Sequence, residues 1–425
     1  MFDQSLKPIT CPTKLESRSV VDRLWEDVLK ASEQKSLFII CRQFYRNAPC
    51  RLLAVAAILS LLSLFFTTSL AGQSGWKVEI VDDGQGTDVG MYTSMAIDRS
   101  GNFHIGYFNA STSNLQYSYR SRQDQKWSKM AVERDAGTFV SLVADSQGFP
   151  HLAYNSPVRR GVRYAYWDGK QWHFQLIDPV ATQFTTSIQL DASGNPRIAY
   201  FESTHTNKGN GAKLKYAYFD GTSWFTRTVA LRPRQGVYNS LAIDPTGQTH
   251  IAFAESSHVE YATYDGSQWQ YEEIDSTTGT DASAGLGLTL ALDATGVPQL
   301  AYFDPGKKTL KYASKKSGVW KTEVVEQLSG TPKFPDGASI RLDSGGEPHI
   351  AYYDSGSGVL KYAVRQDEKW TIEIVDQKGN VGISPSLSLD STGKPYIAYY
   401  DSTNKQLRMA IQNSEASVPK SAAKP

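Results

Sequence analysis

The stretch Ser339–Trp370, SIRLDSGGEPHIAYYDSGSGVLKYAVRQDEKW, holds three short runs of alternating, β-branched and aromatic residues. These runs are SIRLD, HIAYYD and VLKYAV, and the turn-forming segments SGGEP and SGSG separate them. A fourth run, WTIEIV, begins at Trp370. Period-two alternation bounded by Gly, Pro, Ser and Asp is typical of strands joined by tight turns. The stretch therefore predicts an antiparallel meander of four strands, a unit too small to be stable alone.

This unit recurs seven times along the chain. The tryptophan that opens the fourth run returns at intervals of 45 to 52 residues, a period typical of propeller blades. The aspartate that ends the first run recurs in step with it, as do the HIAYYD-like and LKYA-like runs. The two series are Trp76, Trp127, Trp172, Trp224, Trp269, Trp320 and Trp370, and Asp98, Asp145, Asp191, Asp244, Asp293, Asp343 and Asp390. We predict an all-β, seven-bladed β-propeller over residues 76–412, with four antiparallel strands in each blade.

Turn residues set the order of the strands within a unit. Asp-Gly pairs, as in YFDGTSW, join the third run to the tryptophan run, because Gly accepts the positive φ of such hairpins. With this order the chain begins with a fourth strand, Trp76–Val81, and ends with a third strand, Leu407–Ile411. We expect the first strand to complete the last blade and close the ring, which protects the sheet edges.

The composition excludes several classes of function. The formal net charge is +1, whereas proteins that bind phosphate backbones usually carry a basic stripe, so we expect no nucleic-acid partner. The three cysteines, Cys11, Cys41 and Cys50, all precede the repeats. The predicted propeller therefore has no disulfide, thiolate metal site or cysteine nucleophile of its own. We expect neither a cofactor nor a metal.

An uncharged apolar segment, LLAVAAILSLLSLFFTTSL, precedes the repeats. Arg42, Arg46 and Arg51 lie on its N-terminal side, so the positive-inside bias places the N-terminus in the cytoplasm and the repeats outside. Residues 52–71 fit either a signal peptide that is cleaved after its small residues or an apolar transmembrane anchor helix. In both cases the propeller is extracytoplasmic: periplasmic, at the cell surface or secreted.

The two ends of the chain are predicted to lie outside the propeller. Residues 1–51 form a cytoplasmic segment or a long n-region, with a short amphipathic helix suggested by apolar residues at helical spacing. Residues 413–425, rich in Ser, Ala and Lys, are expected to be a disordered tail. A membrane contact is expected through residues 52–71 alone, if that segment is not cleaved.

The repeat pattern W-x-x-E-I-V…S-L-A-L-D-x-x-G-x-P-H-I-A-Y-Y-D…L-K-Y-A resembles repeats of exported bacterial β-propeller proteins, which are loosely akin to sialidase-like propellers. The resemblance covers Trp76 to Gln412 and implies the propeller fold. It implies little about activity, because propellers host unrelated chemistries. The chain lacks the F-R-I-P motif of the sialidases, since Pro196-Arg197-Ile198 is a repeat element.

The candidate site lies on the face that carries the loops from the fourth strand of one blade to the first strand of the next. Acidic residues close the second strand in five blades, and together with two loop residues they are the predicted ligand contacts: Glu202, Glu255, Asp304, Asp354, Asp401, Tyr92 and Lys333. An alternative is that these acids, and the serines or threonines that open the inner strands beside them, only cap the loop backbone. The seven LALD aspartates and the histidines His104, His151, His250 and His349 recur one per blade and are interpreted as structural.

These observations favour a non-catalytic extracytoplasmic propeller that binds a glycan, a peptide or a partner protein on its loop-rich face. The blades are nearly uniform, and the sequence contains no G-x-S-x-G, H-E-x-x-H or phosphate-loop motif. We therefore assign no catalytic residue. The alternative is a sialidase-like hydrolase or lyase that acts on glycans with carboxylates at the channel mouth.

Overall fold

The computed structural model describes residues 75–413, except 125, 157, 159, 180–183, 207–208, 231–237, 256, 277–285 and 334. For residues 203–206 and 209–212 it describes the backbone alone. The predicted cytoplasmic segment 1–51, the predicted signal or anchor helix 52–71 and all but the first residue of the predicted tail lie outside the described residues. Within the described part of the chain, no helix combines the length and apolar character needed to cross a membrane.

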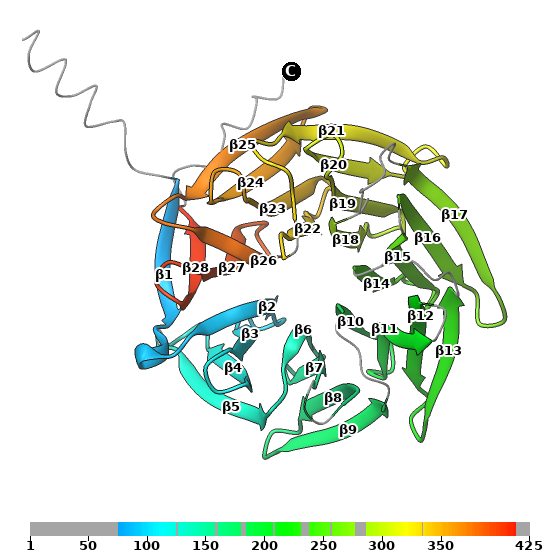
Figure 1. The fold of residues 1–425 in the computed structure, drawn as a ribbon, viewed down its shortest axis with the longest axis horizontal. Helices are drawn as coiled ribbons and strands as arrows, with labels where there is room; N and C mark the ends of the chain where they lie inside the picture. The colour runs from blue at the N-terminus through cyan, green and yellow to red at the C-terminus, as the bar shows by residue number, and fades with distance from the viewer. Residues whose placement is uncertain are drawn as a thin grey trace, which may run out of the picture. The chain divides into compact units, whose positions relative to one another are not determined.

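The described residues form seven antiparallel sheets of four strands, arranged as the blades of a ring (Figure 1). The predicted fold class, blade number and strand order are confirmed. Each blade is named below by its first strand, which lies innermost. These inner strands are β2 (Val89–Ile97), β6 (Thr138–Ala144), β10 (Thr186–Leu190), β14 (Asn239–Ile243), β18 (Leu286–Leu292), β22 (Ala338–Leu342) and β26 (Val381–Leu389). The second strands are β3 (Phe103–Asn109), β7 (Pro150–Asn155), β11 (Pro196–Thr206), β15 (Thr249–Glu255), β19 (Pro298–Asp304), β23 (Pro348–Asp354) and β27 (Pro395–Asp401).

The two outer strands of each blade carry the LKYA-like and tryptophan runs. The third strands are β4 (Asn114–Arg120), β8 (Val162–Trp167), β12 (Gly209–Phe219), β16 (His258–Tyr264), β20 (Thr309–Ser314), β24 (Val359–Gln366) and β28 (Gln406–Gln412). The fourth strands are β5 (Ser128–Arg134), β9 (Trp172–Asp178), β13 (Trp224–Ala230), β17 (Trp269–Ser276), β21 (Lys321–Gln327), β25 (Lys369–Asp376) and β1 (Trp76–Asp82). A short 3-10 turn, η1 (Gly84–Gly86), lies between β1 and β2.

The ring closes where the two ends of the propeller meet. Strand β1 pairs with β28 in antiparallel register, from Trp76 opposite Gln412 to Ile80 opposite Arg408. The last sheet therefore has the order β1-β28-β27-β26, and its outermost strand comes from the start of the propeller. This confirms the predicted closure.

The LALD aspartates hold the turns between the first and second strands. Asp390 Oδ1 accepts hydrogen bonds from the backbone N–H groups of Thr392 (2.9 Å) and Lys394 (3.1 Å). Gly393 completes the turn at φ 84°, a value that L-residues with a side chain rarely adopt. The same pair of backbone bonds recurs in the other blades, at Asp98, Asp145, Asp191, Asp244, Asp293 and Asp343. Their interpretation as turn residues is confirmed by these bonds.

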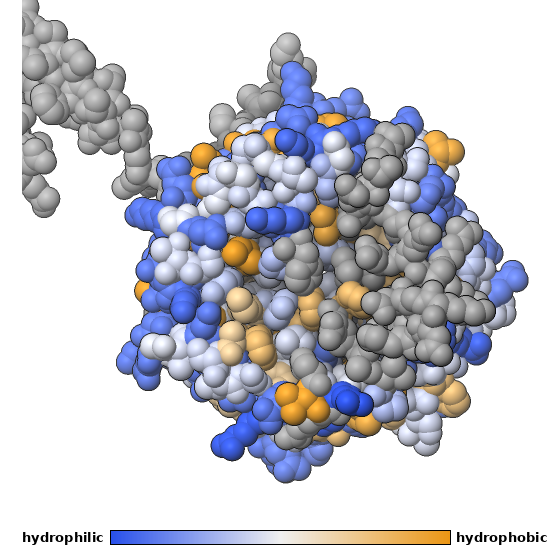
Figure 2. Space-filling model, in the orientation of Figure 1, coloured by the Kyte–Doolittle hydropathy of each residue, from blue (hydrophilic) through white to orange (hydrophobic). Residues whose placement is uncertain are grey.

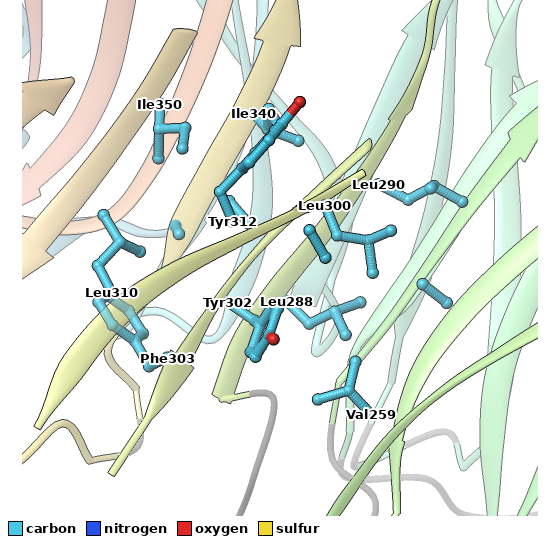
Figure 3. Packing of buried hydrophobic residues seen from close by; sticks show 14 of the residues in the cluster. Val259, Leu288, Leu290, Leu300, Tyr302, Phe303, Leu310, Tyr312, Ile340 and Ile350 are labelled. Carbon is cyan, nitrogen blue, oxygen red and sulfur yellow. The ribbon is translucent and has the colours of Figure 1, made fainter. Parts of the chain in front are cut away.

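The hydrophobic core lies between the faces of neighbouring blades. Figure 3 shows part of it, where Leu290 and Leu300 of the β18 blade approach Ile340 and Ile350 of the β22 blade. Side chains alternate between the two faces of a strand, so each sheet packs against both of its neighbours. All four residues are at most 6% exposed. Burying such a side chain contributes about 1.5–3 kcal/mol, so the blades stabilise one another.

The tryptophans join each blade to the one before it. Trp76 Nε1 donates to Glu373 of β25 at 2.7 Å, and its ring packs edge-on against Tyr362 at 5.0 Å. Trp320 and Trp370 make the corresponding bonds to glutamates of the preceding blade. Where the Glu of the W-x-x-E motif is present, it is therefore the acceptor for the tryptophan of the next blade. Met130 and Gln175 take its place for Trp172 and Trp224, and Trp269 Nε1 has no hydrogen-bond partner among the described residues. Both residue types recur because each blade must bind its neighbour.

A second polar contact between blades lies at the other end of the fourth strand. In six blades the first tyrosine of the second strand donates to the acid that ends the preceding fourth strand. These pairs are Tyr107 with Asp82, Tyr154 with Glu133, Tyr200 with Asp178, Tyr302 with Asp275, Tyr352 with Glu326 and Tyr399 with Asp376. In the remaining blade, Phe253 replaces the tyrosine and Ala230 replaces the acid. Donor and acceptor are thus lost together, which leaves neither group buried and unpaired.

Candidate functional site

The inner strands surround a cavity of about 220 Å³ at the centre of the ring. Residues from all seven inner strands or the segments directly before them line it, together with Pro335 of the loop that leads into β22. We call its end nearer the start of the inner strands the channel mouth. Figure 2 shows apolar residues gathered around the middle of the ring and mainly hydrophilic residues at its periphery. A concave site with mixed lining is typical of ligand pockets.

Two aromatic side chains lie together at the channel mouth, in neighbouring blades. The ring centroids of Tyr92 and Phe139 are 4.4 Å apart. Both residues have φ 54°, within bulges that interrupt the pairing of β2 with β3 and of β6 with β7. A bulky residue with positive φ is strained, and such strain is concentrated at functional sites. Burial raises the pKa of the Tyr92 hydroxyl, so it stays protonated and is a hydrogen-bond donor.

Hydroxyl groups form a complete ring below the mouth. In every blade a serine or threonine of the inner strand accepts a hydrogen bond from a backbone N–H of the next inner strand. For example, Leu142 N donates to Ser94 Oγ at 2.9 Å. The acceptors are Ser94, Ser141, Ser187, Ser240, Thr289, Ser339 and Ser386. The alternative interpretation, that these residues cap loop backbone, is wrong in detail, because their bonds join inner strands.

Below the hydroxyl ring, two polar side chains line the cavity. Arg341 follows Ser339 by two residues on β22, and Gln189 follows Ser187 by two residues on β10. The strands β14 and β18 lie between them on one side and β26, β2 and β6 on the other, so they face each other across the ring (Figure 1). Arg341 is the one charged side chain among the described residues of the lining.

The loop before β22 extends to a blade that is not its neighbour. The hydroxyl of Tyr238, directly before β14, donates a hydrogen bond to the backbone oxygen of Asp336 at 3.1 Å. The Asp336 side chain is buried and accepts a bond from Lys333 N at 2.8 Å. Burial raises the pKa of Asp336 above its ordinary value. Lys333, one of the predicted contacts, is exposed on this loop, two residues before Pro335.

Three of the predicted acids are buried at the ends of their strands, where the turns begin. Asp304, Asp354 and Asp401 are at most 1% exposed. Burial alone would raise the pKa of Asp354, but bonds from Lys361 (2.9 Å), Ser357 (2.8 Å) and Ser329 hold it below its ordinary value.

The other two buried acids also bond within their own blades, although Asp304 Oδ2 has no hydrogen-bond partner among the described residues. Asp401 binds two backbone N–H groups of its turn and Arg408 Nη2 at 2.7 Å. Asp304 accepts the backbone N–H of Lys307 at 3.1 Å. Each of these acids is thus held by contacts of its own blade or of the adjoining loop. The structure does not gather the three into one cluster, and their predicted role in ligand binding stays a prediction.

The other two predicted acids are partly exposed. Glu202 lies 3.4 Å from Lys213 Nζ and 3.2 Å from Lys215 Nζ, both on the paired strand β12. Glu255 ends β15 and is also partly exposed. Of the seven predicted contacts, Tyr92 alone is among the described residues that line the cavity. Arg341 and Gln189 were not predicted from the sequence, although both depart from the small or apolar residue at this position in most other blades.

The recurring position of the histidines is explained by contacts within each blade. His151 Nδ1 bonds Tyr164 Oη at 2.5 Å, and its Nε2 lies 3.6 Å from the turn residue Asp145. Burial lowers the pKa of His151, more than Asp145 raises it, so the ring is neutral near pH 7. His104, His250 and His349 have the same partners in their blades. A different group could hold a metal ion: ligand atoms of His258, Glu260 and Glu273 lie within 4.8 Å of one another.

Comparison with known proteins identifies a fold and no family. No protein-family model matches the chain, and no curated protein matches it. A solved ulvan lyase, from a new polysaccharide lyase family and bound to GlcA(1-4)Rha3S units, matches with a TM-score of 0.56 and 11% identity. The match covers 80% of this chain and 96% of that one.

Two further structures are similar. A mutant of AofleA from Arthrobotrys oligospora has a TM-score of 0.50 and 13% identity, over 71% of this chain and 90% of its own. The intramolecular trans-sialidase from Ruminococcus gnavus has a TM-score of 0.42 and 12% identity, over 81% of this chain and 99% of its own. At these identities the likeness shows the fold alone. The chain therefore shares the fold of the ulvan lyase, whereas the expected bacterial repeat family stays a prediction.

Proposed function

We propose that the protein is a glycan-active propeller that holds a sugar chain at its channel mouth. The observation that carries this proposal is the mixed lining of the cavity. The Tyr92 and Phe139 rings offer flat apolar surfaces for the C–H face of a sugar ring, and the nearby hydroxyl and amide groups suit its hydroxyls. The strained backbone at both aromatic residues supports a binding role for them.

Binding alone and cleavage of the glycan both fit this site, and the likeness in fold to an ulvan lyase supports cleavage. We therefore propose glycan cleavage, by elimination or hydrolysis, in preference to the non-catalytic function that the uniform blades favour. None of the described residues lining the cavity is a carboxylate. A pair of channel-mouth carboxylates is accordingly not part of the proposal.

The proposed contacts begin with Tyr92, which lines the cavity, and Lys333, which is exposed on the loop beside it. Glu202 and Glu255 are partly exposed and stay candidates at the ends of their strands. The buried acids are proposed to act on the ligand indirectly, by fixing the turns that follow the second strands. A peptide or a partner protein is the remaining alternative for the ligand.

A glycan array and an activity screen with the full-length chain test the proposal. Elimination at a uronic acid produces an unsaturated product that absorbs ultraviolet light, whereas hydrolysis produces new reducing ends without that absorption. Glycan binding accompanied by the formation of either product supports the proposal. Glycan binding without any product would instead favour the non-catalytic function. An array without a glycan ligand, together with an inactive screen, contradicts the proposal.

Tyr92→Gly is the variant that tests the site. Glycine suits the left-handed backbone, and Gly287 occupies the equivalent position in the β18 blade with φ 62°. The variant removes the aromatic ring without new backbone strain, so we expect glycan binding to fall while the fold persists. Phe225→Ser, at an exposed position on the outer strand β13, is the matched control and should leave binding unchanged.

We also propose that the propeller works outside the cytoplasm. The support is the apolar segment 52–71 with three arginines on its N-terminal side, which lies outside the described residues. Fractionation of cells that express the full-length chain, followed by protease treatment of intact cells, tests this proposal. A propeller that is recovered in the cytosol and protected from protease contradicts it.

A further inference from the structure

The central channel contains an arginine without an acid opposite it. Arg341 lines the cavity, and its Nη1 donates to the backbone oxygen of Ile340 at 2.8 Å. It forms no ion pair with any described residue, and the described lining contains neither Asp nor Glu. Arg341 lies deep within the ring, where solvent reaches it through the channel.

Other interior cations of this propeller are paired. Arg163 Nη2 lies 2.9 Å from Glu133, Lys361 Nζ lies 2.8 Å from Glu326, and Arg408 Nη2 lies 2.7 Å from Asp401. A charge that leaves bulk water loses solvation energy, which a partner of opposite sign must restore. Burial lowers the pKa of Arg341, yet a guanidinium keeps its proton under all ordinary conditions. The channel therefore retains a positive charge whose partner is missing from the described lining.

The hydroxyl ring adds further donors beside this charge. Each of its members accepts a backbone N–H through its oxygen, as Ser339 does from Leu387 N at 3.0 Å. A serine hydroxyl has one proton to donate as well as lone pairs to accept with. No described acceptor takes the proton of any member of the ring, and every member lines the cavity, so these protons are available to whatever fills the channel. Gln189 adds an amide on the opposite side.

We propose that Arg341 and the hydroxyl ring bind an oxyanion inside the channel: a carboxylate, sulfate or phosphate group. The planar guanidinium presents paired N–H donors that match the two oxygens of such a group. The equivalent position holds Ala96, Val143, Gln189, Ala242, Ala291 and Ser388 in the other blades, so the channel has a single cationic centre at this level. Resting on the proposed function, we further infer that the glycan is acidic and that its charged substituent enters the channel.

Thermal unfolding of the full-length chain with sodium sulfate tests the anion site, with sodium chloride at equal ionic strength as the reference. An anion at about 100 times its Kd adds about 2.7 kcal/mol to the free energy of unfolding, which raises Tm by a few degrees. We expect this rise in the wild type and its loss in Arg341→Gln, which copies the residue of the β10 blade. Arg99→Gln, at an exposed arginine, is the control and should retain the rise. An equal rise in Arg341→Gln, or no rise in the wild type, overturns the proposal.

Titration with a uronate-containing oligosaccharide and a neutral one tests the link to the glycan. We expect Arg341→Gln to lower the affinity for the acidic ligand by about 10- to 100-fold, the range for the loss of a hydrogen bond to a charged group. The affinity for the neutral ligand should not change. If the affinities for both ligands fall equally, Arg341 only shapes the channel, and the inference that the glycan is acidic is wrong. If sulfate binds and no oligosaccharide does, the anion site stands and the proposed glycan function fails.

Discussion

Replacing Tyr352 by phenylalanine is expected to destabilise the propeller, although it removes a single oxygen. The Tyr352 hydroxyl donates to Glu326 Oε2 at 2.6 Å, and Lys361 Nζ lies 2.8 Å from the other oxygen of the same acid. Tyr352 is 0% exposed, so no water replaces the lost donor. A hydrogen bond to a charged group contributes about 1.5–3 kcal/mol, and we expect a loss of that size. The bond joins the β18 and β22 blades, so the loss weakens their contact.

The reverse substitution in another blade provides the matched control. Phe253 occupies the equivalent position of the β14 blade, where Ala230 stands in place of the acid. Phe253 is 3% exposed, so Phe253→Tyr buries a hydroxyl without its usual acceptor, at a cost of about 1–3 kcal/mol. We therefore expect opposite changes at equivalent positions to destabilise equally. If tyrosine were favoured merely for its packing, Phe253→Tyr would be neutral.

Equilibrium unfolding in urea measures both effects, and a double-mutant cycle isolates the pair. Glu326→Ala alone leaves the Tyr352 hydroxyl unpaired and removes one acid from Lys361, which keeps Asp354 at 2.9 Å. Once the acid is gone, the further change Tyr352→Phe is expected to cost little. The coupling free energy is therefore expected to exceed about 1 kcal/mol. Additivity of the two substitutions within about 0.5 kcal/mol would refute the assignment of this contact as a bond between blades.

Three further predictions test the turns, the bulges and the ring closure. Burial lowers the pKa of His349 more than the nearby acids raise it, so the folded state favours the neutral ring. The contribution of His349 to the free energy of unfolding is therefore complete above the unfolded pKa near 6.5. Below that pH the free energy of unfolding decreases by at most about 1.4 kcal/mol per pH unit. His349→Gln, which copies Gln299 of the β18 blade, is expected to reduce this pH dependence. The free energy of unfolding, measured between about pH 8 and 5, would contradict the prediction if its slope were unchanged. Gly137→Ala places a Cβ 2.6 Å from the β4 backbone, at a residue with φ 108°. It is expected to lower the free energy of unfolding in urea by more than about 1 kcal/mol. Gly86→Ala is the control and should cost less, because its Cβ meets no neighbouring atom. Deleting β1 (Trp76–Asp82) removes two core side chains, Trp76 and Val81, and is expected to lower the free energy of unfolding by at least about 3–6 kcal/mol. A ring of unchanged stability would show that β1 does not close it.

The fold could be predicted because the repeat appears in the sequence several times over. Each of the seven units carries the same strand pattern and the same turn residues, so local preferences and the count of units agree. The closure followed from the order of the strands, since the propeller begins with Trp76 in a fourth strand and ends with a third strand. These are properties of short segments and of their number, which a single sequence displays directly.

The candidate site could be predicted only in part. The loop-rich face and Tyr92 were predicted because irregular loops interrupt the repeat there. The contacts of the acids could not be predicted, since a sequence does not show that Asp354 is enclosed by Ser329, Ser357 and Lys361. Arg341 was missed because it occupies a repeat position in an otherwise regular strand.

The sequence by itself determined the number of blades, the order of strands within each blade and the residues that form the turns. These depend on backbone preferences and on side-chain alternation, which act over a few residues. The tertiary structure decided which polar groups form hydrogen bonds between blades and which remain available to a ligand. That division depends on neighbours far apart in the chain, as with Trp76 and Glu373 across the closure or Ser94 and Leu142 in adjacent inner strands. The channel exists only after the ring has closed, so the position of Arg341 within it is a property of the assembled ring.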